Sequence, residues 1–392
     1  MSKFVSVYKS DLLFLFLLYS FLPGIYKIMG NQLLLLLNIP IIVVLFVRGT
    51  AKLQLFVCDK FFLLYLLYIV LQTFVWSIMP FPNKTALLTG AYLSILPMTG
   101  FFFSRFISFF DFVRIVMIVS FFHGVVGVLQ YPLFGFSIFP SSFSEILLDG
   151  VMAGRMSSVS GSLGFGCMLT TAAICAFYFK KRVLFSFFLV CIVFSLQRSA
   201  WLATVTAILL CIAYEMHKKG VHSIFKYFGI TIFIVIVLIF FVGCFSSDLN
   251  LLIDKFNSIG SAIEERDGLW LAGIENFKSF PLGTGVGQVG QVARFESSSF
   301  LSVPDGDYFR ILSEFGIVVV FFYLLIFISI LFLVIRHSFL SREELCILSI
   351  VIGFSIQMIG SNITEFYYNN FIYWIFVGYF FLLIKKYVIV YR

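Results

Sequence analysis

Four ionisable side chains stand at the start of a long apolar run, in the stretch SVPDGDYFRILSEFGIVVVFFYLLIF, residues 302–327. Asp307, Arg310 and Glu314 are spaced i, i+3 and i+7, so on a helix they share one face. Asp305 precedes this face. Carboxylates at a helix N-terminus also cap it, so capping is an alternative interpretation of Asp305 and Asp307. The other interpretation is a carboxylate held near arginines at the rim of a cavity.

Three arginines elsewhere have the chemistry to bind phosphate, because a guanidinium offers a planar fork of donors that matches phosphate oxygens. Arg198 lies in SLQRSAWLATV, Arg266 in EERDGLW and Arg155 in GRMSSVSG. Each has a plainer alternative. Arg198 could be an interfacial arginine that extends to water, Arg266 could form a surface salt bridge with an adjacent carboxylate, and Arg155 could contact lipid headgroups.

The composition predicts that these residues are positioned by a membrane-embedded bundle. Of the 392 residues, 61% are hydrophobic and 12% are charged, which is typical of a polytopic membrane protein. Lipid leaves helices as the sensible spanning element, so the predicted fold class is all-α. We predict about twelve spans: 11–29, 31–47, 61–80, 85–104, 112–135, 161–179, 183–197, 199–214, 224–245, 307–335, 345–361 and 366–384.

These spans form one predicted integral-membrane domain, with helices one to nine in residues 1–245 and helices ten to twelve in residues 307–392. Residues 246–306 form a large periplasmic loop with short helices. Most of the 27 basic residues fall on one side of this arrangement, which predicts that both termini are cytoplasmic. The formal charge of +8 is therefore an orientation signal and does not indicate nucleic-acid binding. The seven cysteines form no CxxC pair, so we predict neither disulfides nor a metal site.

Arg198 is predicted to lie below the outer membrane surface. The 34 residues between Arg182 and His217 give about 51 Å of helix at ~1.5 Å per residue. Two full crossings of a ~30 Å hydrocarbon core need about 60 Å. The hairpin between spans seven and eight is thus too short to reach the surface fully. An ionised group at that depth is costly and by default marks a functional site.

The large loop contains two further signals. Trp270, Leu271, Ile274 and Phe277 have helical spacing, which predicts a short amphipathic helix that lies on the outer membrane face or folds back over the bundle. The segment PLGTGVGQVG is either a flexible turn or a loop whose N–H groups face a phosphate or line a cavity. The four histidines all lie in mid-span or in cytoplasmic loops, so the best-placed general base at the outer face is Asp305.

Taken together, these motifs resemble the O-antigen ligase and polymerase superfamily of bacterial envelope proteins. The resemblance covers mainly residues 150–330 and rests on GRMSSVSG, QRSAWLA, RDGLWLAGIENFKSFPLGTGVG and DGDYFRILSEFG. It implies a glycosyltransferase without metal or other cofactor. The enzyme would act at the periplasmic face, with a polyprenyl-pyrophosphate-linked glycan as donor, a glycan acceptor, and a chain-length regulator protein as a further partner.

The resemblance also implies roles for individual residues. Arg198, Arg266 and Arg155 would hold the pyrophosphate and Asp305 would be catalytic, while acceptor binding or positioning falls to Asp307, Tyr308, Arg310 and Glu314. Asp305 stands where the ligase branch usually carries histidine, which favours a repeat-unit polymerase over a ligase. SVSGSL lacks the Pro-Asn often found at that point, which weakens the assignment of Arg155.

Two other classes compete with this prediction. Asp305 and Asp307 form a DxD pattern of the kind that metal-dependent sugar transferases use, although two carboxylates alone make a poor Mg²⁺ site. A lipid-linked oligosaccharide flippase or other transporter also suits twelve spans. Transporters commonly place charges near the membrane midplane, whereas the polar residues of this chain gather at the outer face.

Overall fold

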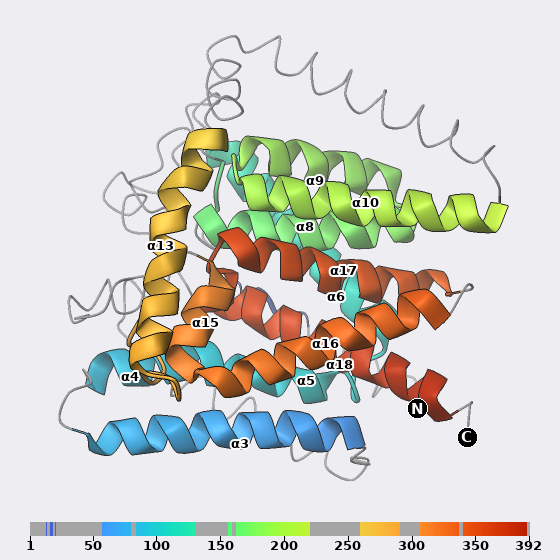
Figure 1. The fold of residues 1–392 in the computed structure, drawn as a ribbon. Helices are drawn as coiled ribbons and strands as arrows, with labels where there is room; N and C mark the ends of the chain where they lie inside the picture. Colours follow the sequence, from blue (N-terminus) through green and yellow to red (C-terminus); the bar gives the residue numbers. More distant parts are fainter. Residues whose placement is uncertain are drawn as a thin grey trace. The chain divides into compact units, whose positions relative to one another are not determined.

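The computed structural model of the chain describes residues 57–79, 84–130, 156–158, 162–219, 259–290, 306–336 and 340–389, together with residues 13, 16–18 and 20. All regular elements in these described ranges are helices (Figure 1). The predicted all-α fold class is therefore confirmed.

Six of the described helices are long and apolar enough to cross a membrane: Asp59–Ile78, Ala86–Phe103, Phe109–Gln130, Ile317–Val334, Arg342–Gly360 and Tyr367–Tyr387. Gly164–Tyr178, Arg182–Phe194 and Arg198–Tyr214 are shorter apolar helices. The protein is thus a multi-pass membrane protein. The predicted spans 31–47 and 224–245, and most of 11–29, lie outside the described residues, so the number twelve stays a prediction.

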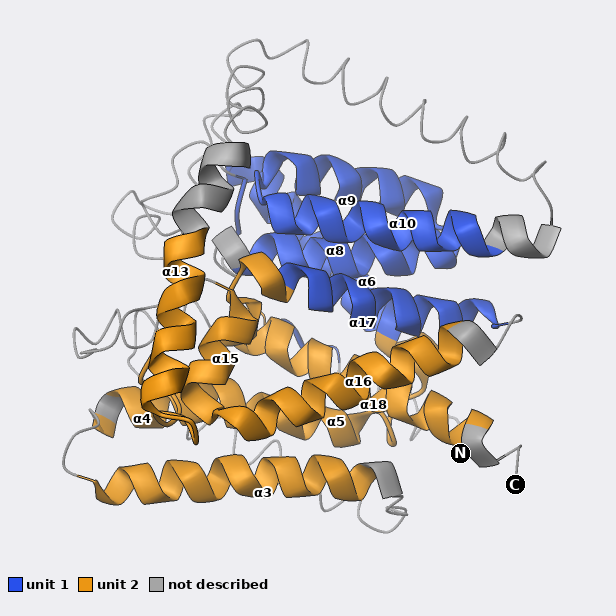
Figure 2. Ribbon diagram, in the orientation of Figure 1, with its two compact units in different colours: residues 1–17, 113–265, 338–357 blue, residues 18–112, 266–337, 358–392 orange. Residues whose placement is uncertain are grey.

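The chain forms two compact units, coloured separately in Figure 2. Unit 1 contains residues 1–17, 113–265 and 338–357. Its described helices are α8 (Ser162–Tyr178), α9 (Arg182–Phe194) and α10 (Arg198–Lys219), with most of α6 (Phe109–Gln130) and of α17 (Arg342–Gly360). Helix α8 packs against both α9 and α10. Hydrogen bonds join parts of the unit that are distant in sequence. The Tyr178 and Ser349 hydroxyls lie 2.7 Å apart, and the Tyr214 hydroxyl donates to the Leu340 carbonyl.

Unit 2 contains residues 18–112, 266–337 and 358–392. It includes α3 (Val57–Ile78), α4 (Lys84–Gly90), α5 (Gly100–Phe103), α15 (Asp307–Phe315), α16 (Ile317–Arg336) and α18 (Tyr367–Ile389), with the larger part of α13 (Ile259–Ser279). Its core is aromatic. Phe62 of α3 stacks on Phe101 with ring centroids 3.9 Å apart and also contacts Phe322 and Trp374. Such ring pairs add to the stabilisation that burial alone provides.

The predicted span 85–104 corresponds to a candidate membrane span, Ala86–Phe103, but its helix is irregular. A π-helical turn, Ala91–Ile95, and a 3₁₀ turn, Leu96–Thr99, separate α4 from α5. Pro97 lies in the first turn of the 3₁₀ segment. Because proline has no N–H and clashes with the preceding turn, it prevents a continuous α-helix here.

The predicted span 307–335 is wrong as a single helix. Gly316, with φ of +71° and ψ of −157°, separates α15 from α16. Only α16 is a candidate span, and α15 is a short helix of nine residues outside it. The sequence pattern concealed this break because the face of Asp307, Arg310 and Glu314 runs directly into the apolar residues of α16.

The break is stable because the backbone groups that it releases find new partners, as a polar group buried in a membrane protein must. The Ser313 carbonyl accepts from the Thr284 N–H at 2.9 Å, and the Glu314 carbonyl from the Gly285 N–H at 3.1 Å. The Tyr68 hydroxyl donates to the Phe315 carbonyl at 3.0 Å. In the other direction, the Ile317 N–H donates to the Pro281 carbonyl at 3.0 Å.

Candidate active site

Helix α15 carries the charged residues predicted from the opening motif. It begins after Gly306, and its face of Asp307, Arg310 and Glu314 points into the protein. These three side chains are 0%, 2% and 1% exposed. Burial of charges is tolerated only where they are paired and hydrogen-bonded, so their partners decide what this face does.

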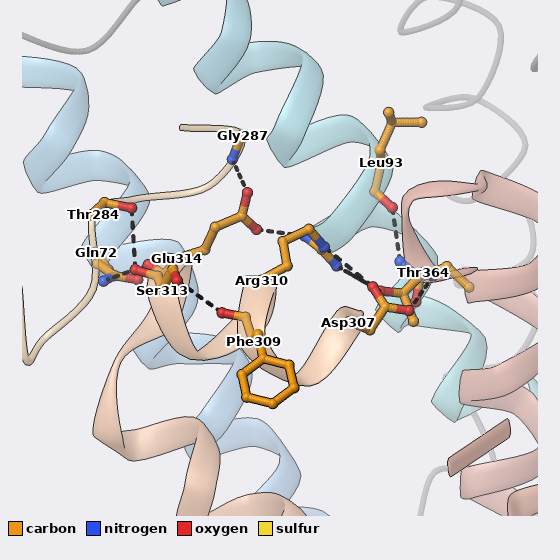
Figure 3. Close-up of polar contacts among 11 residues, drawn as sticks. Gln72, Leu93, Thr284, Gly287, Asp307, Phe309, Arg310, Ser313, Glu314 and Thr364 are labelled. Carbon is orange, nitrogen blue, oxygen red and sulfur yellow. Dashed lines mark hydrogen bonds and ion pairs between the residues drawn. The ribbon is translucent and has the colours of Figure 1, made fainter. Parts of the chain in front are cut away.

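Arg310 is the centre of the cluster (Figure 3). Its Nε and Nη2 donate to Asp307 Oδ1 at 3.2 and 3.0 Å, and its Nη1 donates to Glu314 Oε2 at 2.6 Å. Nη2 also donates to the Thr364 hydroxyl at 2.6 Å. Every nitrogen of the guanidinium therefore has an acceptor. Charge-assisted bonds of this kind are about twice as strong as neutral ones.

Asp307 does not act as a helix cap in the bonds that the structure describes. Its Oδ2 accepts from the Thr364 backbone N–H at 2.8 Å, and its Oδ1 accepts from the Thr364 hydroxyl at 2.7 Å. Thr364 belongs to the 3₁₀ turn Ile363–Glu365, which joins α17 to α18. Both oxygens of Asp307 thus bind protein donors, which also disfavours the DxD metal site.

Glu314 connects α15 to the glycine-rich loop. Its Oε1 accepts from the Gly287 N–H at 2.9 Å. Residues 283–290 are all buried, and Gly283, Gly285, Gly287 and Gly290 have positive φ. The loop is therefore an ordered part of the interior and not a flexible turn. The sequence allowed the N–H groups of this loop to bind a phosphate. In the structure, the N–H of Gly287 binds the Glu314 carboxylate instead.

The electrostatics of the cluster follow from its burial. Burial raises the pKa of Glu314 to about 7, although Arg310 and the Gly287 N–H act in the opposite direction. Burial also raises the pKa of Asp307, again against Arg310. Burial lowers the pKa of Arg310, but Glu314, Asp307 and Glu365 outweigh it and raise that pKa above its ordinary value. Three carboxyl groups thus surround one guanidinium, and burial opposes the ionisation of Asp307 and Glu314.

The other face of α15 packs on aromatic residues and on α13. Phe309 stacks on Trp270 with ring centroids 5.5 Å apart, and the Ser313 hydroxyl donates to the Gly273 carbonyl. The helix predicted around Trp270 is present as α13, Ile259–Ser279, and is longer than expected, while its place at the membrane face stays a prediction. Tyr308 is half-buried and meets the ring of Tyr323 edge-on at 5.4 Å.

Unit 1 positions Arg198 at the first residue of α10, directly after the tight turn that ends α9. The Arg198 side chain is half-buried. Beside it, Gln197 is 3% exposed, and neither its amide nitrogen nor its amide oxygen has a hydrogen-bond partner among the described residues. The Met156 N–H donates to the Phe194 carbonyl at 2.9 Å, so the GRMSSVSG motif contacts this turn. Helix α9 has 13 residues, about 20 Å of helix, and the depth of the turn in the membrane stays a prediction.

The remaining predicted residues are described only in part. Asp305 and Arg155 lie outside the described residues, and the backbone of Arg266 lies in α13 without a described side chain. Arg198 belongs to unit 1, whereas Asp307, Tyr308, Arg310 and Glu314 belong to unit 2. Thr364 was missed by the sequence analysis, because it lies 57 positions from Asp307 in an ordinary inter-helix turn.

Fold and site define a class: a multi-pass membrane protein whose described elements are all helices, with a buried charged cluster beside a glycine-rich loop. Residues 183–324 match the model of a protein family described as O-Antigen ligase. This match supports the similarity of the chain to the O-antigen ligase and polymerase superfamily. Members of that superfamily are enzymes of envelope polysaccharide biosynthesis that act on lipid-linked glycans. The match does not distinguish the ligase branch from the polymerase branch. The chain matches no curated protein and no solved structure.

Proposed function

We propose that this protein is a glycosyltransferase that polymerises oligosaccharide repeat units carried on polyprenyl pyrophosphate, at the periplasmic face of the inner membrane. The observation that carries the proposal is the family match, because residues 183–324 contain Arg198, Arg266, Asp305 and the buried cluster of Arg310. Both termini are cytoplasmic in this proposal, and a chain-length regulator protein is a further partner.

The donor pyrophosphate binds to arginine. Arg198 stands at the N-terminus of α10, where the helix dipole and the first N–H groups also favour an anion. The contact between Met156 and the α9–α10 turn supports a role for the preceding residue, Arg155, at the same place. Arg266 follows from the family resemblance. Fixed cations near the leaving group stabilise the charge that grows on it in the transition state, and one such contact is worth ~10²–10³ in rate.

Asp305 accepts the proton of the attacking sugar hydroxyl. The hydroxyl oxygen forms a bond to the anomeric carbon of the donor, the bond from that carbon to the phosphate oxygen breaks, and the pyrophosphate leaves on its lipid. A single displacement of this kind inverts the anomeric centre. No metal takes part in the proposed reaction. General-base catalysis contributes ~10²–10⁴ in rate.

The polymerase is preferred to the ligase because Asp305 stands where the ligase branch carries histidine. The ligase, which would transfer finished polysaccharide to lipid A-core, is the second candidate because the matching family model bears that description. A flippase is the third outcome to be tested.

The surface glycan of a deletion strain separates these functions. A core that bears one repeat unit is the result expected for a polymerase. A bare core with accumulated lipid-linked polymer would instead show a ligase, and repeat units held at the cytosolic leaflet would show a flippase. Activity of the purified protein in EDTA would exclude the metal-dependent alternative.

A further inference from the structure

The amide of Gln197 is buried in unit 1 without a protein partner. Gln197 directly precedes α10, and its backbone carbonyl accepts from the N–H groups of Ala200 and Trp201, both at 3.1 Å. Its side chain is 3% exposed, yet neither the amide nitrogen nor the amide oxygen is hydrogen-bonded to a residue that the structure describes. Buried polar groups in native proteins nearly always have a partner. The partner of this amide therefore comes from outside the described chain.

Helix α8 leaves room for the amide. Gly166 lies in the first two turns of α8, and a Cβ on it would overlap Oε1 of Gln197 and lie 3.0 Å from its Cδ. Glycine is a poor helix former compared with alanine, so the sequence forgoes helix propensity at this position. Helix α8 packs against both α9 and α10 in unit 1 (Figure 2). The place of the amide is thus set by two packed helices and not by a loose side chain.

A second amide without a partner lies on the neighbouring helix α6. The Met156 N–H donates to the Phe194 carbonyl at 2.9 Å, and the Met156 side chain also lies against Gly127 of α6 together with the ring of Phe165. Gln130 follows Gly127 by three positions and so lies on the same face of α6. Neither buried polar atom of the Gln130 amide has a partner within the described ranges. Unit 1 therefore has more than one buried amide available to a ligand.

The two polar atoms of an amide restrict the chemistry of such a ligand. The NH₂ group donates and the carbonyl oxygen accepts, so only a ligand that both accepts and donates satisfies Gln197. An ionised phosphate only accepts, and an acyl chain does neither. A sugar hydroxyl does both, and neighbouring hydroxyls on one ring offer a donor beside an acceptor. The amide of Gln197 therefore matches a sugar better than a phosphate.

The next residue along the chain, Arg198, has the complementary chemistry. Its guanidinium is half-buried and matches phosphate oxygens, as an amide matches hydroxyls. In a lipid-linked glycan the first sugar is bonded directly to the pyrophosphate. Two adjacent residues of the protein thus correspond to two adjacent parts of one ligand.

We propose that Gln197 is a specificity residue that binds the sugar next to the pyrophosphate of the lipid-linked donor. This inference rests on the proposed function, in which Arg198 holds the pyrophosphate. It divides recognition between neighbouring residues: Arg198 binds any polyprenyl pyrophosphate, and Gln197 binds only one that carries a glycan.

The test measures binding of two probes to the purified full-length protein. One probe is the polyprenyl-pyrophosphate-linked repeat unit isolated from the deletion strain, and the other is polyprenyl pyrophosphate without sugar. Q197L removes both polar atoms of the amide. We expect it to raise Kd for the glycan-bearing probe about 5–10-fold, the loss of one or two neutral hydrogen bonds, and to leave Kd for the bare probe within about 2-fold. R198A should raise both Kd values more than about 10-fold, because it removes charge-assisted bonds.

The outcomes separate the inference from the proposed function. Equal changes in both Kd values for Q197L, or no change in either, would overturn the inference; in the second case the amide binds only water. Failure of the unmodified protein to bind either probe, or an R198A variant that binds both normally, would instead overturn the proposed function.

A second variant displaces the amide without removing it. G166A places a methyl group where the Gln197 amide lies, so it should weaken binding of the glycan-bearing probe about as much as Q197L does. It should cause no further loss in the double variant G166A/Q197L, since changes that act through one group are non-additive. The matched control is G353A on α17, where a Cβ would lie 3.4 Å from Ile174 Cδ1, an ordinary contact. Equal losses from G166A with and without Gln197 would show an effect of helix packing alone and would overturn the inference.

Discussion

Two charged regions of this protein differ in how completely their polar groups are satisfied. Around Arg310 in unit 2, each guanidinium nitrogen binds a protein acceptor and both oxygens of Asp307 bind protein donors. At the α9–α10 turn in unit 1, the buried amide of Gln197 has no partner among the described residues, and Arg198 beside it is half-buried. A saturated network fixes a backbone, whereas a polar group left without a partner is suited to a ligand. This difference is what the proposed function predicts, with the Arg310 cluster as a scaffold and the α9–α10 turn as a binding site.

The largest expected effect comes from removing the cation of the Arg310 cluster. R310M leaves the carboxyl groups of Asp307 and Glu314 buried without their cation, which should lower the free energy of unfolding by about 3–5 kcal/mol. The measurement is the denaturation midpoint of the purified protein in detergent. Arg342, exposed at the start of α17, supplies the control R342M, which should stay within about 0.5 kcal/mol. Equal midpoints for the two variants would show that the network is not a scaffold.

The next effect concerns the binding site. R198A should reduce chain extension by ~10²–10³ because it removes a cation from the leaving pyrophosphate, while the amount of protein in the membrane stays normal. The assay is the chain-length distribution of the surface glycan, with R182A as a control at the exposed start of α9. Normal chain lengths in R198A would rule out this role for Arg198.

A smaller effect is the pH dependence of the scaffold. Burial raises the pKa of Glu314 to about 7, above about 4.3 in an unfolded chain, so the folded state binds more protons between these values. Stability should therefore fall as the pH rises from about 4.5 to 7, by on the order of 1–3 kcal/mol. E314Q, which cannot ionise, should flatten this slope in thermal unfolding measured from pH 5 to 8. Asp307 contributes a slope of the same sign, because burial raises its pKa too. A slope that E314Q leaves unchanged would contradict the assignment.

The smallest expected effect has opposite signs for stability and function. Q197L replaces an unsatisfied buried amide with an apolar side chain and should stabilise the protein by about 1 kcal/mol. It should also raise KM for the lipid-linked substrate several-fold, if the amide binds ligand. Thermal unfolding and steady-state kinetics on the same preparation test both signs. A variant that is less stable, or that has unchanged KM, would remove the contrast between the two regions.

Much of the fold could be predicted from the sequence, because lipid imposes long apolar helices that composition reveals directly. The face of Asp307, Arg310 and Glu314 was also predictable, since helical spacing depends only on nearby residues. The break at Gly316 was not, because it is stabilised by the loop at 281–285 and by Tyr68 on α3. Thr364 was not predictable for the same reason: its partners lie more than 50 positions away and no local pattern identifies them.

The glycine break between α15 and α16 has a mechanical consequence. The end of α15 is hydrogen-bonded to the 281–285 loop and to α3, so α15 is not the end of one continuous membrane-spanning helix. The first turn of α16 is held by the same loop, because the Ile317 N–H donates to the Pro281 carbonyl. A tilt of α16 in a bilayer of different thickness would therefore act on these loop contacts around Gly316 before it acted on the charged cluster.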